Sequence, residues 1–175
     1  MANNLFEKSF NLKNNSYLST KFKPLWGQKG VFTSIPVIGK TPRFVGLNRY
    51  LSTFNNTCRD YKFDAKLNPK MIKELIGEDI KQIKIFNHLL RIATNGTTLS
   101  ISLRKRTTTK SSVIGFIKKY KRKDFRNKNL YYKKILKFMS EINYSENEIS
   151  LSRDGEITEG AVTHLIFIKE GKVYI

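Results

Sequence analysis

Residues 154–167 read Asp-Gly-Glu-Ile-Thr-Glu-Gly-Ala-Val-Thr-His-Leu-Ile-Phe, and this stretch is the most informative part of the sequence. It opens on Asp154-Gly155, a dipeptide typical of tight turns. A second turn pair, Glu170-Gly171, follows it. Between and around the turns lie short apolar runs that predict strands at 148–152, 162–169 and 173–175. The C-terminal part of the chain is therefore predicted to be rich in strands.

Working outward, apolar spacing predicts three helices. Residues 45–61 place apolar side chains three and four apart, which is one face of a helix. A second helix begins at Asn68-Pro69, with Asn as its cap and Pro at its first position, and should end at Gly77. Residues 129–142 form the third amphipathic segment.

The remaining patterns predict antiparallel strands. Residues 80–93 and 98–103 are joined by Asn95-Gly96, a strong hairpin signal. Residues 22–44 are predicted to form two short strands that turn at Gly39-Lys40. We find no internal repeat.

The charge balance is unusual for a small soluble enzyme. The 175 residues include 33 Lys and Arg but only 14 Asp and Glu, which gives a net charge of +19 and a pI near 10.1. Such self-repulsion is commonly relieved by a polyanion, with nucleic acid the first choice and an anionic membrane surface the second. A genome rich in Lys codons is the alternative explanation, but codon bias does not account for the scarcity of Asp and Glu.

Bases concentrate in residues 104–137, where only Asp124 opposes them. Aromatic residues are interleaved among these bases, a pattern that suits contact with RNA phosphates and stacking on RNA bases. Packing within a helix is the alternative role for Phe125, Tyr131 and Tyr132. The residues predicted to bind RNA are Arg104, Lys105, Arg106, Lys110, Lys118, Lys119, Lys121, Arg122, Lys123, Arg126 and Lys128.

Other chemistry has little support in the sequence. Cys58 is the only cysteine, which excludes an internal disulfide and a cysteine-based metal site. His88 and His164 are the only histidines, so we predict no metal site. No apolar run reaches the length of a transmembrane helix. Residues 1–23 are predicted to be a basic N-terminal arm or a flexible end rather than an organellar presequence.

Residues 154–167 also resemble the motif G-x-[IV]-T-E-G-x-x-S-N-[IL]-F of the class IV pyridoxal-phosphate (PLP) enzymes, which include branched-chain aminotransferases and aminodeoxychorismate lyase. Residues 25–32 (LWGQKGVF) resemble the family's L-Y-G-D-G-V-F segment, and residues 50–58 (YLSTFNNTC) resemble its H-L-x-R-L-x-x-S-A helix. The three matches come in the family's order and span residues 24–175. The resemblance implies an α+β fold, with an N-terminal lobe of antiparallel sheet and two helices and a truncated second lobe rich in strands.

The resemblance also shows what is missing. In the family a lysine forms the Schiff base with PLP, about 32 to 35 residues before the motif's Glu. Counting back from Glu159 reaches 124–127, and the best alignment places Arg126 there, which is not a usable nucleophile. Lys123 and Lys128 flank this window, and a slip of one residue would rescue either.

Other family positions are altered as well. The phosphate-binding Arg aligns with Thr53 and the motif's Asn with His164. Glu159, which in the family pairs with the pyridine nitrogen, is retained. We therefore interpret Glu159, Gly160 and Thr163 as a vestigial cofactor site that preserves a turn, and we expect no catalytic residues and no bound cofactor or metal.

These observations predict a basic arm (1–23), an N-terminal lobe (24–115) and a truncated C-terminal lobe (116–175). The favoured function is that of a non-catalytic RNA-binding protein, a subunit of a ribosome and most plausibly a mitochondrial one. Its partners would be rRNA and neighbouring proteins. The alternatives are an active or split PLP enzyme, and a structural subunit of a membrane-bound organellar complex.

Overall fold

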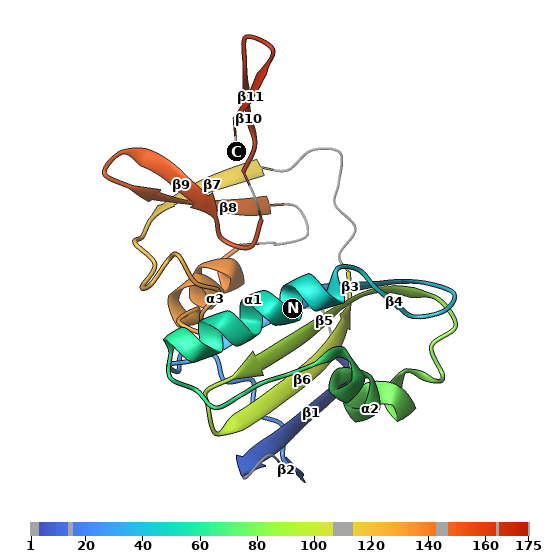
Figure 1. Ribbon diagram of the computed structural model, residues 1–175. Coiled ribbons are helices and arrows are strands. Elements are labelled where there is room, and N and C mark those ends of the chain that lie inside the picture. Colours follow the sequence, from blue (N-terminus) through green and yellow to red (C-terminus); the bar gives the residue numbers. More distant parts are fainter. Residues whose placement is uncertain (1–3, 14–15, 107–113, 143–146, 164, 175) are drawn as a thin grey trace. The chain divides into compact units, whose positions relative to one another are not determined.

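The computed structural model describes residues 4–13, 16–106, 114–142, 147–163 and 165–174. The chain divides into two compact units, coloured along the sequence in Figure 1. The N-terminal unit comprises Met1–Thr107 and Arg126–Tyr131, and the C-terminal unit comprises Thr108–Phe125 and Tyr132–Ile175. The fold is α+β, as the sequence predicted.

An antiparallel sheet of six strands forms the N-terminal unit, in the order β2-β1-β6-β5-β3-β4. Its strands are β1 (Asn4–Lys13), β2 (Ser16–Thr20), β3 (Val31–Gly39), β4 (Arg43–Phe44), β5 (Phe86–Thr94) and β6 (Thr98–Lys105). The predicted hairpin at Asn95-Gly96 is confirmed as β5–β6, and the turn at Gly39-Lys40 joins β3 to β4.

The N-terminal segment differs from the arm that we predicted. Its described residues form β1 and β2, and β1 pairs with β6 through most of its length. Phe10 is buried in the core, and the hydroxyls of Ser9 and Ser100 lie 2.8 Å apart between the two strands. Apolar residues alternate with polar ones here, and the predominance of Lys and Asn concealed that alternation.

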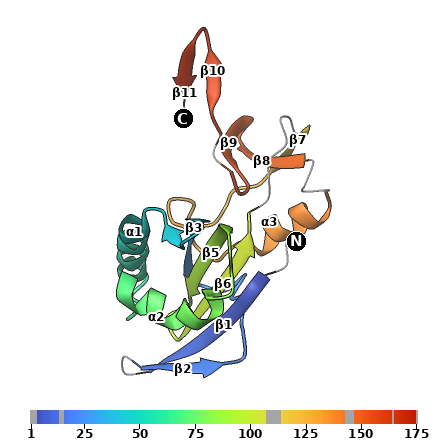
Figure 2. The same cartoon turned by 90° about the vertical axis from the view of Figure 1, so that its right-hand side faces the viewer.

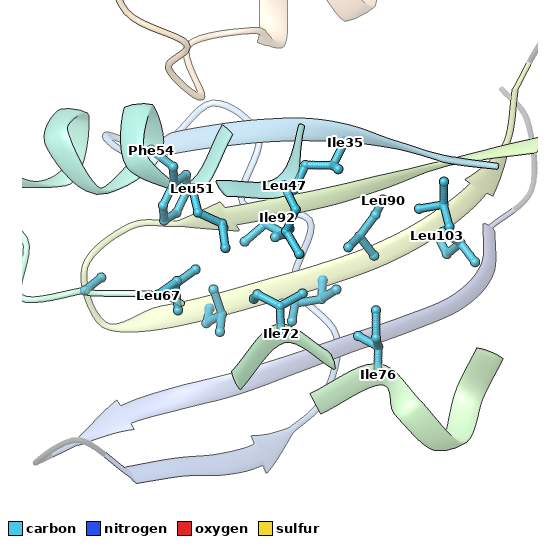
Figure 3. Packing of buried hydrophobic residues seen from close by; sticks show 14 of the residues in the cluster. Ile35, Leu47, Leu51, Phe54, Leu67, Ile72, Ile76, Leu90, Ile92 and Leu103 are labelled. Carbon is cyan, nitrogen blue, oxygen red and sulfur yellow. The ribbon is translucent and has the colours of Figure 1, made fainter. Parts of the chain in front are cut away.

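Helices α1 (Leu47–Asp60) and α2 (Pro69–Ile80) cover one face of this sheet (Figure 2). Figure 3 shows their apolar side chains meeting those of the strands. Leu51 and Phe54 of α1 and Ile72 and Ile76 of α2 are almost fully buried. The predicted helical faces are thus confirmed.

Helix α2 begins as the sequence predicted but ends later. The Asn68 side chain accepts a hydrogen bond from the Met71 N–H at 3.0 Å. The helix then continues through Gly77 to Ile80. Ile80 packs against the core, and Asp79 forms an ion pair with Lys8 at 2.7 Å. These tertiary contacts override the helix-breaking tendency of a glycine.

The opposite face of the sheet is covered by irregular chain. Leu25, Ala93 and Leu130 form a second buried cluster. The guanidinium of Arg91 lies 3.8 Å from the ring centre of Trp26 and donates to the Pro24 carbonyl at 2.7 Å. Burial lowers the pKa of Arg91 to about 10.

The C-terminal unit is smaller. Its sheet has the order β7-β8-β9, from β7 (Ile114–Lys119), β8 (Asn147–Arg153) and β9 (Glu156–Gly160). Strands β7 and β8 run parallel, and α3 (Lys133–Ser140) lies between them in sequence. A separate hairpin joins β10 (Phe167–Lys169) to β11 (Lys172–Tyr174). The strand predicted at 162–169 is therefore shorter than expected, and α3 is shorter than 129–142.

Candidate functional site

The retained motif residue Glu159 is bound by an arginine. Arg122 Nε lies 3.2 Å from Glu159 Oε1, and Arg122 Nη2 lies 3.0 Å from Oε2. Both carboxylate oxygens are thus engaged by a two-point contact, the strongest geometry for this pair of groups. The Arg122 side chain is only 8% exposed, and that of Glu159 is 29% exposed.

Neighbouring groups hold Arg122 in this position. Its Nη2 also donates to the Phe125 carbonyl at 2.8 Å. The Tyr132 ring lies 5.7 Å from the guanidinium carbon. Burial is the main reason that the pKa of Tyr132 is raised, with Glu159 adding to the effect and Arg122 opposing it. The cluster thus combines a buried charge pair with an aromatic neighbour.

Gly160 follows Glu159 at a crowded turn. A β-carbon at this position would collide with the Thr163 hydroxyl and would lie 2.7 Å from the Thr163 carbonyl oxygen. The next residue, Ala161, is buried and donates its N–H to the Ile149 carbonyl at 2.7 Å. The Glu-Gly sequence therefore has a packing reason in this chain, independent of any cofactor.

The positions around the expected lysine fall in both units. Arg126 and Lys128 belong to the N-terminal unit, and Lys123 belongs to the C-terminal unit with Glu159. All three side chains are exposed. The Lys128 carbonyl accepts a hydrogen bond from the Phe32 N–H at 3.0 Å. The Lys128 ammonium lies 5.9 Å from the centre of the Tyr50 ring. Thr53, at the position of the phosphate-binding Arg, is exposed on α1, whereas His164 lies outside the described residues.

The bases predicted to bind RNA are also divided between the units. Arg104, Lys105, Arg106, Arg126 and Lys128 lie in the N-terminal unit, and Lys118, Lys119, Lys121, Arg122 and Lys123 lie in the C-terminal unit. Lys110 lies outside the described residues. Arg122 differs from the other nine, because its guanidinium is buried and paired with Glu159. The others are exposed or half-buried, although Lys118 forms an ion pair with Glu141 at 3.4 Å.

The interleaved aromatic residues separate into two groups. Tyr132 packs with the core of the C-terminal unit, and Tyr120 meets Phe138 edge-on at 5.9 Å. Phe116 and Phe125 are exposed, the latter to 49%. Phe116 and Phe125 are thus the most accessible, whereas Tyr120, Tyr131 and Tyr132 are half-buried.

A shallow hollow of about 390 Å³ lies in the C-terminal unit. Sequence reasoning missed two residues that contribute to it, Ser152 and Arg153. The signal for Arg153 was present, since a base directly before an Asp-Gly turn is held at the tip of a hairpin. The lining residues are Lys119, Tyr120, Lys121, Ser152, Arg153 and Asp154.

Two features are absent from the described part of the chain. No group of three or more potential metal ligands gathers there. His88 is buried, and its Nδ1 accepts from the Asn87 N–H at 3.0 Å. No helix among the described residues is long and apolar enough to cross a membrane.

Comparisons with known proteins find similarity in structure but not in sequence profile. No family profile and no curated protein matches the chain. Solved structures do match. The branched-chain amino acid aminotransferase of Escherichia coli gives a TM-score of 0.68 at 14% identity, over 99% of this chain and 67% of that one.

Two further structures agree. The branched-chain aminotransferase of the archaeon Thermoproteus uzoniensis, solved with norvaline, gives a TM-score of 0.67 at 12% identity, over 95% of this chain and 66% of that one. A putative 4-amino-4-deoxychorismate lyase of Legionella pneumophila gives a TM-score of 0.67 at 14% identity, over 88% of this chain and 66% of that one. The chain thus spans about two thirds of the length of these enzymes.

The architecture is therefore that of the class IV aminotransferases, as the three motifs predicted. At such low identity the likeness establishes the fold and nothing further. The chain therefore has a class IV aminotransferase-like fold and covers part of it.

The residues present do not fit PLP. Glu159, the expected partner of the pyridine nitrogen, has both oxygens engaged by Arg122. A pyridine N–H would have to displace a buried guanidinium, which would then lose its counter-ion. The best-aligned position for the Schiff-base lysine holds Arg126, and the position of the phosphate-binding arginine holds Thr53.

Proposed function

We propose that this chain is a non-catalytic RNA-binding protein built on a class IV aminotransferase fold. One observation carries the proposal: among the ten described bases predicted to meet RNA, Arg122 alone is buried, and it is buried on Glu159. The same arrangement leaves the other bases accessible to a polyanion and occupies the carboxylate that a cofactor would need.

The mechanism is electrostatic. Each Lys or Arg that approaches a phosphate releases condensed counter-ions, so binding is strong at low salt and weakens steeply as salt rises. The net charge of +19 also attracts RNA from a distance and raises the association rate. Exposed Phe116 and Phe125 offer faces on which bases can stack.

RNA binding is tested with a matched pair of triple variants. In the first, Lys119, Lys121 and Lys123 are changed to Gln, and in the second, Lys66, Lys73 and Lys84 are changed to Gln. All six side chains are exposed, so both variants lose the same charge. We expect the first to lower the slope of log K against log salt by about 2 for single-stranded RNA, at about 0.7 per lost contact. No binding by the wild type would refute the proposal, and equal effects of the two variants would mean that RNA is not held by the bases at 119–123 in particular.

The finer proposal is that the protein is a subunit of a ribosome, in an organelle such as the mitochondrion. Support comes from the strongly basic composition and from the mismatch between its residues and PLP. Sedimentation of the tagged protein from lysate tests it. Co-migration with a ribosomal particle at moderate salt is expected, whereas migration as a small free species would exclude the ribosome.

A PLP enzyme is the second candidate, favoured by the fold and by Lys128. That lysine adjoins the β3 segment of the family-like 25–32 stretch through the hydrogen bond from Phe32. This function predicts that added PLP gives a visible absorption band, and that borohydride fixes the cofactor onto Lys128 in a peptide map. A colourless protein would exclude this function, and labelling unchanged in Lys128→Gln would exclude Lys128 as the attachment site and leave Lys123 as the candidate.

A further inference from the structure

The hollow of the C-terminal unit is formed where two parallel strands end together. Lys119, the last residue of β7, pairs with Ser152 of β8. The Tyr120 N–H donates to the Ser152 carbonyl at 3.0 Å, so the ladder continues one residue beyond the strand. The end of β7 is therefore fixed to β8 rather than left loose.

This pairing sorts the side chains by face. Alternate residues of a strand point to opposite sides, which places Lys119 and its partner Ser152 on the face opposite to Tyr120. Lys121, beyond the end of β7, also lines the hollow. The Tyr120 ring packs against Phe138 of α3 and so anchors the segment to the core. Arg153, at the end of β8, supplies a third cation to the same hollow.

The charges of the hollow are unbalanced. Three cations line it, and Asp154 is the only carboxylate among its lining residues. The Arg153 Nε lies 3.5 Å from Asp154 Oδ2, but the Asp154 side chain is 87% exposed. An exposed ion pair of this kind is weak, so an incoming anion can compete for the guanidinium.

We propose that this hollow binds phosphate groups of an RNA backbone, through Lys119, Lys121 and Arg153. The inference rests on the proposed RNA-binding function and assigns that function to one place. The Arg153 guanidinium can hold two phosphate oxygens at once, and the two lysines act as point charges beside it.

The test is a binding titration by fluorescence anisotropy with labelled single-stranded RNA of about 20 nucleotides, across about 50 to 200 mM NaCl. The test variant carries Lys121→Gln and Arg153→Gln. The control carries Lys169→Gln and Lys172→Gln, which removes two exposed cations from the β10–β11 hairpin of the same unit. Circular dichroism confirms that both variants remain folded.

We expect the test variant to lower the salt slope by about 1.4, two contacts at about 0.7 each, and to weaken binding at least tenfold at low salt. The control should lower the slope by much less. If both variants lose the same salt slope and the same affinity, the hollow is not a binding subsite, although RNA binding itself stands.

If the wild type binds no RNA, the proposed function fails together with the subsite. Vesicles of phosphatidylserine and phosphatidylcholine then serve as the second probe. Vesicle binding that depends on Lys121 and Arg153 would assign the hollow to lipid phosphates and overturn the RNA proposal. Vesicle binding that ignores these residues, or no binding at all, would leave the hollow without a ligand.

Discussion

The ion pair between Arg122 and Glu159 keeps a charge inside the C-terminal unit, and each side chain compensates the other. Glu159→Gln would leave Arg122 buried without its counter-ion. Removal of one partner from a fully buried pair costs roughly 3–5 kcal/mol, and the partial exposure of Glu159 reduces this to about 2 kcal/mol. Urea unfolding measures the difference.

Glu156→Gln is the matched control, since Glu156 is an exposed acid on the same strand. A loss for Glu159→Gln no larger than for this control would show that the pair has no structural role. A separate Arg122→Ala variant, incubated with PLP, shows whether cofactor absorption appears once Glu159 is released.

His88 provides a prediction on pH. Its pKa is lowered below the ordinary 6.5, chiefly by burial and in addition by Lys105. His88 is therefore harder to protonate in the folded state than in the unfolded state. The stability that neutral His88 contributes is full above pH 6.5 and declines as the pH falls below that value. Protonation would also remove the Nδ1 acceptor of the Asn87 N–H.

We expect the wild type to lose more unfolding free energy than His88→Gln between about pH 7.5 and pH 5.5, at constant ionic strength. Urea titrations at both pH values provide the comparison. Parallel losses in the two proteins would show that His88 titrates alike in the folded and unfolded states.

At the scale of elements, a substitution at the end of β9 tests whether packing requires the glycine of the Glu159-Gly160 pair. Gly160→Ala would push a methyl group against Thr163. Overpacking of this kind costs about 1–3 kcal/mol. Gly115→Ala in β7 is the control, because a β-carbon there meets nothing within 4 Å. That change should be neutral or stabilising, since glycine weakens a strand. A thermal shift assay ranks the two variants, and equal melting temperatures would contradict the packing role.

The elements also show where sequence reasoning succeeds. Helix α1 and the β5–β6 hairpin depend on local spacing and on one turn, and both were predicted. The parallel pairing of β7 with β8 joins residues more than thirty positions apart, and no local signal specifies it. The end of α2 was misplaced because Asp79 and Ile80 gain contacts from distant residues.

In the candidate site, too, contacts between residues distant in sequence were not predicted. The charge of Arg122 was visible in the sequence, but its burial depends on a partner 37 residues away. Arg153 was overlooked because it is isolated in sequence: the nearest other bases are Lys137 and Lys169, on either side of a stretch without Lys or Arg. Family motifs supplied the architecture that periodicity alone did not specify.

At the scale of the whole molecule, the net charge of +19 makes salt act in two opposite ways. In the free protein, salt screens repulsion between like charges, so the melting temperature should rise as NaCl increases. In the complex, salt weakens phosphate contacts, so the extra stability that RNA provides should shrink. That extra stability is about 2.7 kcal/mol when free RNA is at 100 times its dissociation constant.

The measurement is a thermal melt at rising NaCl, with and without single-stranded RNA. The two curves should converge from opposite directions, because screening acts on the protein alone while counter-ion release acts on the complex. A melting temperature independent of salt in the free protein would mean that the bases are already neutralised by neighbouring groups. Curves that stay parallel would mean that RNA is held by contacts other than phosphates, which would argue against both the electrostatic mechanism and the hollow at Arg153.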